Sequence, residues 1–213
     1  PDAGIHGLGR VPLRIGESLS LGLWLAVLIY FSAAWKDPGK RGLAPFLMLA
    51  VSAGLGYFLS LSPPLVALTP ILRSAWLVVQ VLMAVLTLVF VLLGSLSAMA
   101  SLWPGSRNLE RERNLESWSE RFSLLGFLSW GGMILAGAMW ASQAWGGYWS
   151  WDPIETSSLA TWFLFAVYLH LKRLHGWAGR RLAWATLGLL ALVFFTVWIV
   201  PSLVGTIHSA ARY

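Results

Sequence analysis

The stretch that decides how this chain is read is Trp145-Gly-Gly-Tyr-Trp-Ser-Trp-Asp-Pro-Ile-Glu-Thr156. It places three tryptophans within seven residues and follows them directly with an Asp-Pro-Ile-Glu sequence. Indole rings are amphipathic and favour the membrane–water interface, where a proline-bent backbone can present their flat faces. We predict a shallow platform for a large planar ligand, and the alternative is an aromatic belt that only anchors the segment. The platform residues are Trp145, Trp149 and Trp151.

The polar residues at the end of this motif have a structural explanation. Aspartate is a favoured N-cap residue, and proline is favoured as the first residue of a helix. We therefore expect a helix to begin after Pro153, with Asp152 and Glu155 capping it and bracing the platform. Acid or base catalysis by these two carboxylates is the less favoured reading.

The composition of the whole chain indicates a membrane protein. Hydrophobic residues make up 57% of the 213 positions and charged residues only 11%, against roughly one quarter charged in soluble domains. A membrane-spanning helix needs about 20 apolar residues. The sequence thus predicts an all-α integral membrane protein, a single domain over residues 1–213 with about six transmembrane helices. The predicted spans are residues 18–35, 43–62, 76–102, 122–142, 157–171 and 182–203.

The distribution of basic residues predicts the orientation. Eleven of the fifteen lysines and arginines fall in the segments 36–42, 103–121 and 172–181. By the positive-inside rule these segments face the cytoplasm, and both termini and the tryptophan motif face outward, toward a periplasm or lumen. This asymmetry accounts for the net charge of +6, so no nucleic-acid partner is predicted. Within the second segment, the Glu- and Arg-rich stretch Ser106–Arg121 predicts a short solvated helix held by local ion pairs.

The chain contains no cysteine. It therefore cannot form a disulfide, relay thiols or carry a thioether-linked haem of its own, and it has no zinc finger or cysteine nucleophile.

Four histidines remain as candidate ligands. His170 lies about 12 residues into the fifth predicted span, roughly 18 Å along a helix, in the inner half of the membrane. An ionisable residue at this depth is a functional candidate, although an imidazole bonded to a neighbouring helix is the alternative. His208 follows the last span on the face of the tryptophan motif and is either a ligand or a tail residue. We expect His175 to be a solvated loop residue and His6 to be structural or incidental.

At this point the sequence resembles a known family. The runs Ala136–Trp140, Ala144–Thr156 and Ala166-Val-Tyr-Leu-His-Leu-Lys172 are similar to those of the cytochrome c biogenesis protein CcsA, a haem-handling protein with a tryptophan-rich WWD domain, here residues 140–158. The Asp-Pro-x-Glu-Thr ending and the Tyr-Leu-His-Leu-Lys run resemble CcsA more than its relatives CcmC and CcmF. The resemblance covers residues 70–213 well and the first two spans only in character.

This resemblance implies a function and a partner. CcsA-type proteins work with a CcsB (ResB-like) subunit to export haem b and attach it to the Cys-x-x-Cys-His motif of apocytochrome c outside a bacterial plasma or thylakoid membrane. His170 matches the family's transmembrane histidine, a ligand of haem within the bilayer, and CcsB would supply the second ligand. The chain itself offers no other intramembrane histidine. His208 matches the second external histidine, an axial ligand of haem on the WWD platform.

One position departs from the family pattern. The run Ser74-Ala-Trp-Leu-Val-Val-Gln80 has glutamine where the family has its first external histidine. A glutamine carbonyl is a poor ligand for haem iron compared with imidazole. Three outcomes stay open at Gln80: an external haem held by His208 alone, recruitment of His6 or water, or loss of the outer haem site.

Two classes of function follow. The first is haem delivery for cytochrome c maturation, in which the chain is part of a haem lyase with its partner subunit. The second is a repurposed haem-binding or structural subunit of a larger membrane complex, without synthetase activity. A transporter for another amphipathic ligand is a weaker third reading, because the predicted spans lack the broken-helix pair that transporters use.

Overall fold

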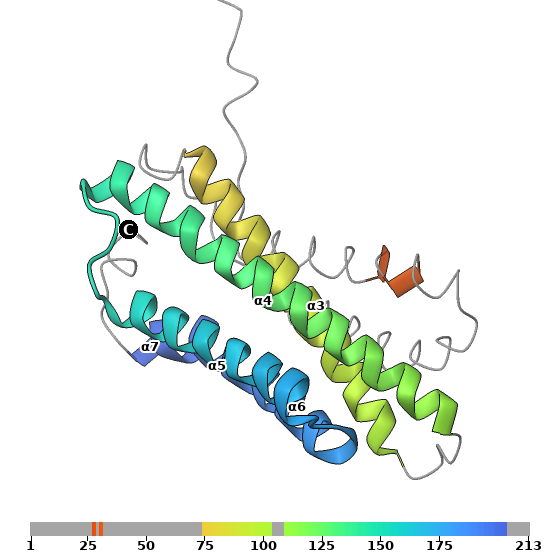
Figure 1. Cartoon of the computed structure of the whole chain (residues 1–213). Coiled ribbons are helices and arrows are strands. Elements are labelled where there is room, and N and C mark those ends of the chain that lie inside the picture. Colours follow the sequence, from red (N-terminus) through yellow and green to blue (C-terminus); the bar gives the residue numbers. More distant parts are fainter. Residues whose placement is uncertain (1–26, 29, 32–73, 104–108, 204–213) are drawn as a thin grey trace, which may run out of the picture.

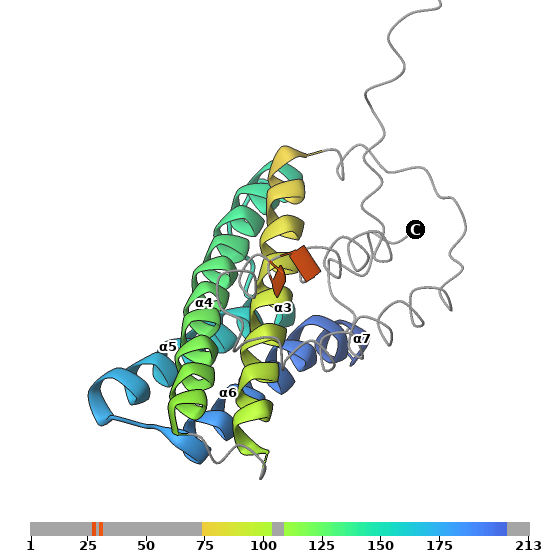
Figure 2. The same cartoon turned by 90° about the vertical axis from the view of Figure 1, so that its right-hand side faces the viewer.

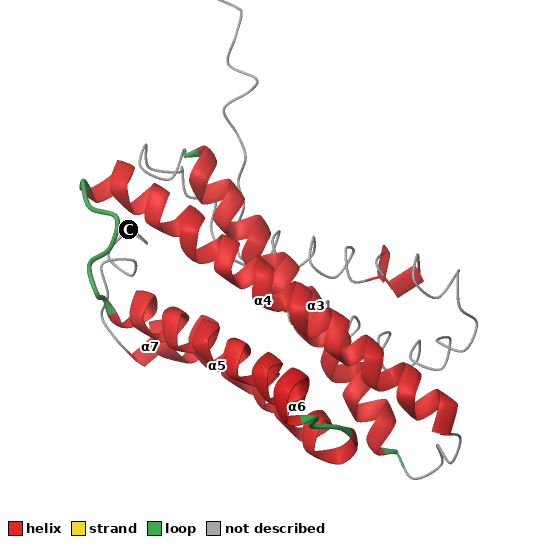
Figure 3. Ribbon diagram, in the orientation of Figure 1, coloured by secondary structure: helices red, strands yellow, loops and turns green. Residues whose placement is uncertain are grey.

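The computed structural model describes residues 27–28, 30–31, 74–103 and 109–203 (Figure 1). Every regular element in these ranges is a helix (Figure 3), so the described part is all-helical as predicted. The second predicted span and nearly all of the first lie outside the described residues, as do His6 and His208. A total of six spans therefore stays a prediction.

The helix α3, Ala75–Leu102, matches the predicted span 76–102 almost residue for residue. Its N-cap is Ser74, whose Oγ accepts from the backbone N–H of Trp76 at 3.3 Å. The same hydroxyl donates to Gln143 Oε1 at 2.7 Å. A single serine thus satisfies one free amide of the first turn and joins α3 to the following helix.

The helix α4, Leu109–Trp145, is one continuous helix of 37 residues. The sequence predicted two pieces here, a separate charged helix ending at Arg121 and a span over 122–142, and that division was wrong. Glu, Arg and Leu are all good helix formers and no proline or glycine stands at the junction, so nothing in the backbone breaks the helix. The charged residues form its first turns.

The helix α5, Pro153–His175, leads through a short turn into α6, Gly179–Phe194. α6 continues as a π-helical segment, η3, Phe195–Ile199, and a last helical turn, α7, Val200–Leu203. The backbone N–H of Val200 donates to Phe195 O, five residues back. Pro201 explains the wider turn, because it has no N–H to donate and its ring would clash with the carbonyl four residues earlier. His175 is the last residue of α5, so its predicted place in a loop was wrong.

The helices form two antiparallel pairs, α3 with α4 and α5 with α6, that lie against each other (Figures 1 and 2). Between them lies a cluster of buried side chains that includes Trp130, Phe165, Leu182 and Val193. A second cluster lies between α3 and α4 and also contains Tyr30. The first predicted span therefore packs on α3 at this residue.

Hydrogen bonds join the helices both between the two pairs and within the pair of α5 and α6. The fully buried Trp130 on α4 donates from its indole N–H to Ser158 O on α5 at 2.8 Å. Thr161 on α5 and Thr196 in η3 share a hydrogen bond of 2.8 Å. In an apolar environment such bonds satisfy buried polar groups and fix which helix faces meet.

Among the described residues, three helices are long and apolar enough to cross a membrane. They are α3, α4 and the continuous segment Gly179–Leu203 that combines α6, η3 and α7. α5 is 23 residues long but is not one of them. Its face toward the other helices carries Ser158, Thr161 and Tyr168, all buried, which lowers its apolar content. The chain is an integral membrane protein.

Candidate functional site

The segment between α4 and α5, Gly146–Asp152, is named here the tryptophan loop. α4 ends at Trp145, and Gly146 follows with φ of 77° while its N–H donates to Ser142 O at 3.1 Å. Glycine at this position is the usual way to end a helix with a left-handed residue. Trp151 also has a positive φ, 59°, and it is the one residue other than glycine to do so in the described part of the chain. A bulky residue in this region is strained, and such strain gathers at functional sites.

The start of α5 has the predicted cap. Asp152 is the N-cap, Pro153 the first helical residue, and Asp152 Oδ1 accepts from Glu155 N at 2.8 Å. Glu155 turns back to the tryptophan loop, where its Oε2 accepts from Ser150 N at 2.7 Å and Ser150 Oγ at 3.1 Å. The expectation that Asp152 caps the helix is confirmed, and Glu155 binds the tryptophan loop. That the two residues brace a ligand platform stays a prediction.

The three tryptophans of the motif have different surroundings. Trp151 is 71% exposed and Trp145 is 45% exposed, whereas Trp149 is partly buried and its Nε1 is inside the protein. The rings of Trp149 and Trp151 meet edge to face at 84° with centroids 5.9 Å apart. The three indoles therefore do not form one flat surface in this conformation. Trp145 and Trp151 offer exposed aromatic surface, and the partly buried Trp149 packs against Trp151.

Gln80 and Trp149 line the same small pocket, of about 50 Å³. Its walls also include Met133, Ile134, Gly137, Ala138, Ile154, Glu155 and Ser158, from α4 and α5. The amide of Gln80 lies against Gly137, where an added Cβ would come within 2.9 Å of Gln80 Nε2. Gln80 Oε1 and Trp149 Nε1 are both buried and have no hydrogen-bond partner within the protein. The structure thus brings together two predicted site residues that are 69 positions apart.

His170 lies near the other end of α5, 17 residues after Pro153, which is roughly 25 Å along a helix. Its side chain is exposed on the outside of the described bundle. Val167 and Leu174, one turn before and after it, are exposed as well, so the histidine stands in an apolar stripe. His175 lies beside it, with ring centroids 5.4 Å apart. An exposed imidazole in an apolar surface can offer a nitrogen to a ligand from the side away from the bundle.

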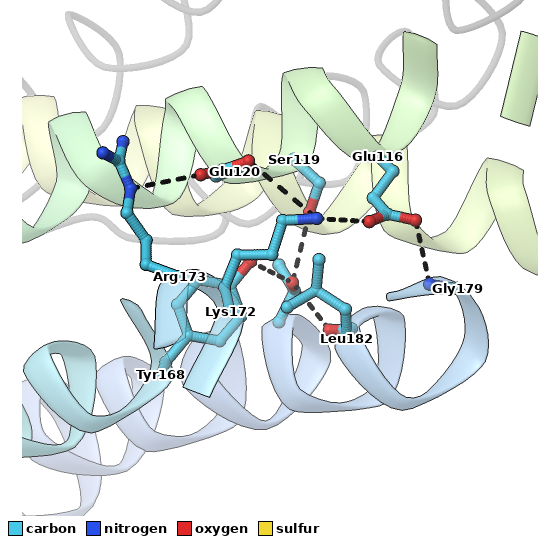
Figure 4. Close-up of polar contacts among 9 residues, drawn as sticks. Glu116, Ser119, Glu120, Tyr168, Lys172, Arg173, Gly179 and Leu182 are labelled. Carbon is cyan, nitrogen blue, oxygen red and sulfur yellow. Dashed lines mark hydrogen bonds and ion pairs between the residues drawn. The ribbon is translucent and has the colours of Figure 1, made fainter. Parts of the chain in front are cut away.

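Two residues after His170, α5 begins a group of ion pairs with α4 (Figure 4). Lys172 forms ion pairs with Glu116 and Glu120, and Arg173 Nε lies 3.5 Å from Glu120 Oε1. Glu116 Oε2 also accepts from the N–H of Gly179, the first residue of α6, at 2.8 Å. We call Glu116, Glu120, Lys172, Arg173 and Gly179 the ionic cluster. The ion pairs of Glu116 and Glu120 cross from α4 to α5, and are not the local pairs predicted for this stretch.

Three buried hydroxyl groups lie close to the ionic cluster, and two of their residues, Ser119 and Tyr168, are labelled in Figure 4. Thr186 Oγ1 on α6 is 3.2 Å from Ser119 Oγ on α4 and 3.1 Å from Tyr168 Oη on α5. All three residues are buried. The cluster and these hydroxyls together fix α5 against α4 and α6 at the turn that precedes Lys172. No sequence motif indicates them, because each pair joins residues far apart in the chain.

Comparisons with known proteins agree with the motif. The sequence pattern of the family described as Cytochrome C assembly protein matches residues 13–208. Three similar relatives all carry the name cytochrome c biogenesis protein CcsA. The protein of Marchantia polymorpha is 49% identical over 88 residues, and that of Gloeobacter violaceus 48% over 103 residues. The protein of Synechococcus sp. (strain CC9902) is 33% identical over 243 aligned positions.

These matches differ in how much of each protein they cover. The Synechococcus match covers 94% of this chain and 78% of the relative. The other two cover 41% and 48% of this chain, and only 26% of the Marchantia protein and 29% of the Gloeobacter protein. No solved structure matches the chain. The family pattern and the long match rest on nearly the whole sequence, so the chain belongs to the CcsA family of cytochrome c assembly proteins.

Proposed function

We propose that this protein handles haem for cytochrome c maturation, together with a CcsB (ResB-like) membrane subunit. Haem b is the cargo, and apocytochrome c outside the membrane is the acceptor. The observation that carries the proposal is the arrangement of α5. A CcsA-type tryptophan motif stands at its first residue and an exposed histidine stands near its last, on a helix set in an integral membrane protein.

The inner end of α5 fits one axial ligand of haem. His170 is accessible from outside the described bundle, and its neighbours Val167 and Leu174 are apolar, as the porphyrin ring is. No group of three histidine, cysteine or carboxylate ligands gathers in the described ranges. In this proposal the second axial ligand comes from a partner subunit that packs on this face of α5. His175, five residues on, is exposed at the helix end.

The outer end fits a planar ligand through the exposed indoles. Trp145 and Trp151 would contact the ring, while Asp152 and Glu155 hold the backbone that presents them. Bound haem supplies the vinyl groups that react with the two acceptor thiols. His208 is the proposed axial ligand on this side. Gln80 fits poorly as an iron ligand, because its amide lies against Gly137 and faces an internal pocket.

The first test is a reduced-minus-oxidised visible spectrum of the chain co-expressed with its partner. We expect His170→Ala to remove the inner haem and His208→Ala to remove the outer one, with His175→Ala as the matched control that keeps both. Haem content unchanged in both His170→Ala and His208→Ala would contradict the proposal.

A second test addresses the tryptophans. Replacing both Trp149 and Trp151 by alanine should abolish binding of the external haem without unfolding the bundle, which circular dichroism would verify. Unchanged haem content in a folded double variant would contradict the platform.

The alternative is a haem-binding or structural subunit of a larger membrane complex that delivers nothing. The glutamine at position 80 favours it, because this residue replaces a ligand of the delivery site. The two functions are separated by deletion in the source organism. Loss of mature cytochrome c supports delivery, whereas normal maturation together with a missing membrane complex supports the structural role.

A further inference from the structure

We propose that the partly open pocket between Gln80 and Trp149 is a water site that joins α3 to the tryptophan loop. In this role Gln80 is a positioning residue for Trp149 and not a ligand of iron. The proposal goes beyond haem handling and does not depend on it, because it concerns how the loop is held whatever the loop binds.

The two residues that line the pocket each carry one unpaired polar atom, and a third group can complement both. Gln80 Oε1 is an acceptor and Trp149 Nε1–H is a donor; both are buried, and neither is bonded within the protein. Native proteins rarely leave such atoms unsatisfied, and internal water is the usual partner. A water molecule donates and accepts at once, so one molecule can satisfy both atoms.

The size and polarity of the pocket suit water. Its volume of about 50 Å³ exceeds the roughly 10–15 Å³ that one water requires. Glu155 and Ser158 add polar atoms to the wall, which allows the approximately three hydrogen bonds that a buried water makes. The negative charge of the Glu155 carboxylate would repel an anion bound in this pocket. Water is therefore favoured over a carboxylate or phosphate group.

The surrounding residues hold Gln80 and the loop backbone near Trp149 in place. Gly137 leaves room for the Gln80 amide, since a Cβ at this position would lie 2.9 Å from Nε2 and 3.1 Å from Cδ. On the opposite side, Glu155 holds the N–H of Ser150 at 2.7 Å, which fixes the backbone beside Trp149. The water would then connect three elements: α3 through Gln80, the tryptophan loop through Trp149, and α5 through Glu155.

The test is amide hydrogen exchange in the loop of the full-length chain, measured by mass spectrometry on residues 146–156. Gln80→Met keeps the length of the side chain and removes its polar atoms. We expect it to accelerate exchange in this segment roughly fivefold to tenfold, because the loop loses one bridged hydrogen bond and opens more often. In a Trp149→Phe background, where the indole N–H is already gone, Gln80→Met should cause no further acceleration.

A pair of glycines supplies the matched control. Gly137→Ala pushes the Gln80 amide aside and should accelerate loop exchange as Gln80→Met does. Gly132 lies on the same helix, and the Cβ added by Gly132→Ala would meet only the flexible side chain of Met83, with Sδ at 3.3 Å. This variant should leave loop exchange at the wild-type rate. Both variants add the same methyl group to α4, so a difference between them reports on the pocket.

A second measurement guards against variants that fold poorly. With 5-fluorotryptophan incorporated, the ¹⁹F resonance of Trp149 is identified by its absence in Trp149→Phe. It should shift in Gln80→Met and Gly137→Ala and stay fixed in Gly132→Ala, while the other thirteen tryptophans report an intact fold. An unshifted resonance with wild-type loop exchange in Gln80→Met overturns the proposal. So does acceleration by Gln80→Met and Trp149→Phe that is fully additive.

Discussion

The two ends of the described bundle differ in how many of their buried polar groups have hydrogen-bond or ion-pair partners. At the ionic cluster, every charged side chain meets a partner on another element, and three buried hydroxyl groups lie close to it. At the tryptophan loop, two buried polar atoms have no partner in the protein, and Trp151 holds a left-handed backbone. Satisfied partners fix one end in place. At the other end the backbone of Trp151 is strained, a feature that often accompanies functional sites.

The largest expected effect comes from opening the fixed end. Glu116→Ala removes one of the two ion-pair partners of Lys172 and the acceptor of the Gly179 N–H, and should lower the free energy of unfolding by about 2 kcal/mol. This lies between the values for exposed and buried ion pairs, because the two side chains are only about one fifth exposed (19% and 22%). Denaturant titration in detergent micelles measures it.

Glu112→Ala is the control, one turn earlier on the same helix and without an ion pair to α5 or α6 among the described residues. It should change the unfolding free energy by less than about 0.5 kcal/mol. If the two variants lose equal stability, the ionic cluster does not hold this end together.

A smaller loss is expected at the start of α5. Asp152→Ala deletes the N-cap acceptor for Glu155 N and should cost about 1 kcal/mol, whereas Asp152→Asn keeps an acceptor and should cost only a few tenths. Thermal unfolding of the three proteins side by side measures the difference. Equal losses in both variants would show that charge, and not capping geometry, is what this position supplies.

Relief of the backbone strain at Trp151 is expected to increase the stability of the protein. Asparagine tolerates a positive φ better than tryptophan, and the indole is mostly exposed. Trp151→Asn should therefore raise the free energy of unfolding by about 0.5–1 kcal/mol while it lowers haem binding. Tyr148→Asn, at another exposed aromatic residue of the loop without a positive φ, should give no such gain. A destabilised Trp151→Asn protein would mean that the strain is not relieved by this change.

The smallest effect is expected at the rim of the ionic cluster. Arg173 is 64% exposed, and its Nε lies 3.5 Å from Glu120 Oε1. Arg173→Ala should cost less than about 0.5 kcal/mol, and this small cost should vanish in high salt. A loss as large as that of Glu116→Ala would contradict the view that the interior pair carries the stability of this end.

Sequence patterns predicted the helices that depend on local features. The span 76–102 was found at Ala75–Leu102, and Asp152 and Pro153 begin α5 as their cap preferences indicate. The change from charged to apolar residues at Arg121 predicts the end of a separate helix, but α4 continues through it. Charged side chains determine whether a helix surface faces water or lipid, but they do not interrupt the backbone hydrogen bonds of the helix.

Contacts between helices could not be predicted in this way. Gln80 was identified only through its place in a family motif, and nothing in the sequence showed that its amide would meet Gly137 and share a pocket with Trp149. The same holds for Glu116 with Lys172, which are 56 residues apart. Such pairs depend on helix rotation and crossing, which a single sequence does not encode in any local pattern. His208 lies outside the described residues, and its role stays a prediction.

The length of α4 has a consequence for how the protein responds to its membrane. A helix of 37 residues is roughly 55 Å long, against about 30 Å for the hydrocarbon core of a bilayer. All of its charged residues fall between Glu110 and Arg121, so the apolar length begins at Phe122 and measures about 36 Å. A thinner bilayer is matched by tilting this rod, and the tilt moves the ionic cluster and Trp145 together because no break separates them. Lipid chain length is therefore a physical control over the presentation of the tryptophan loop.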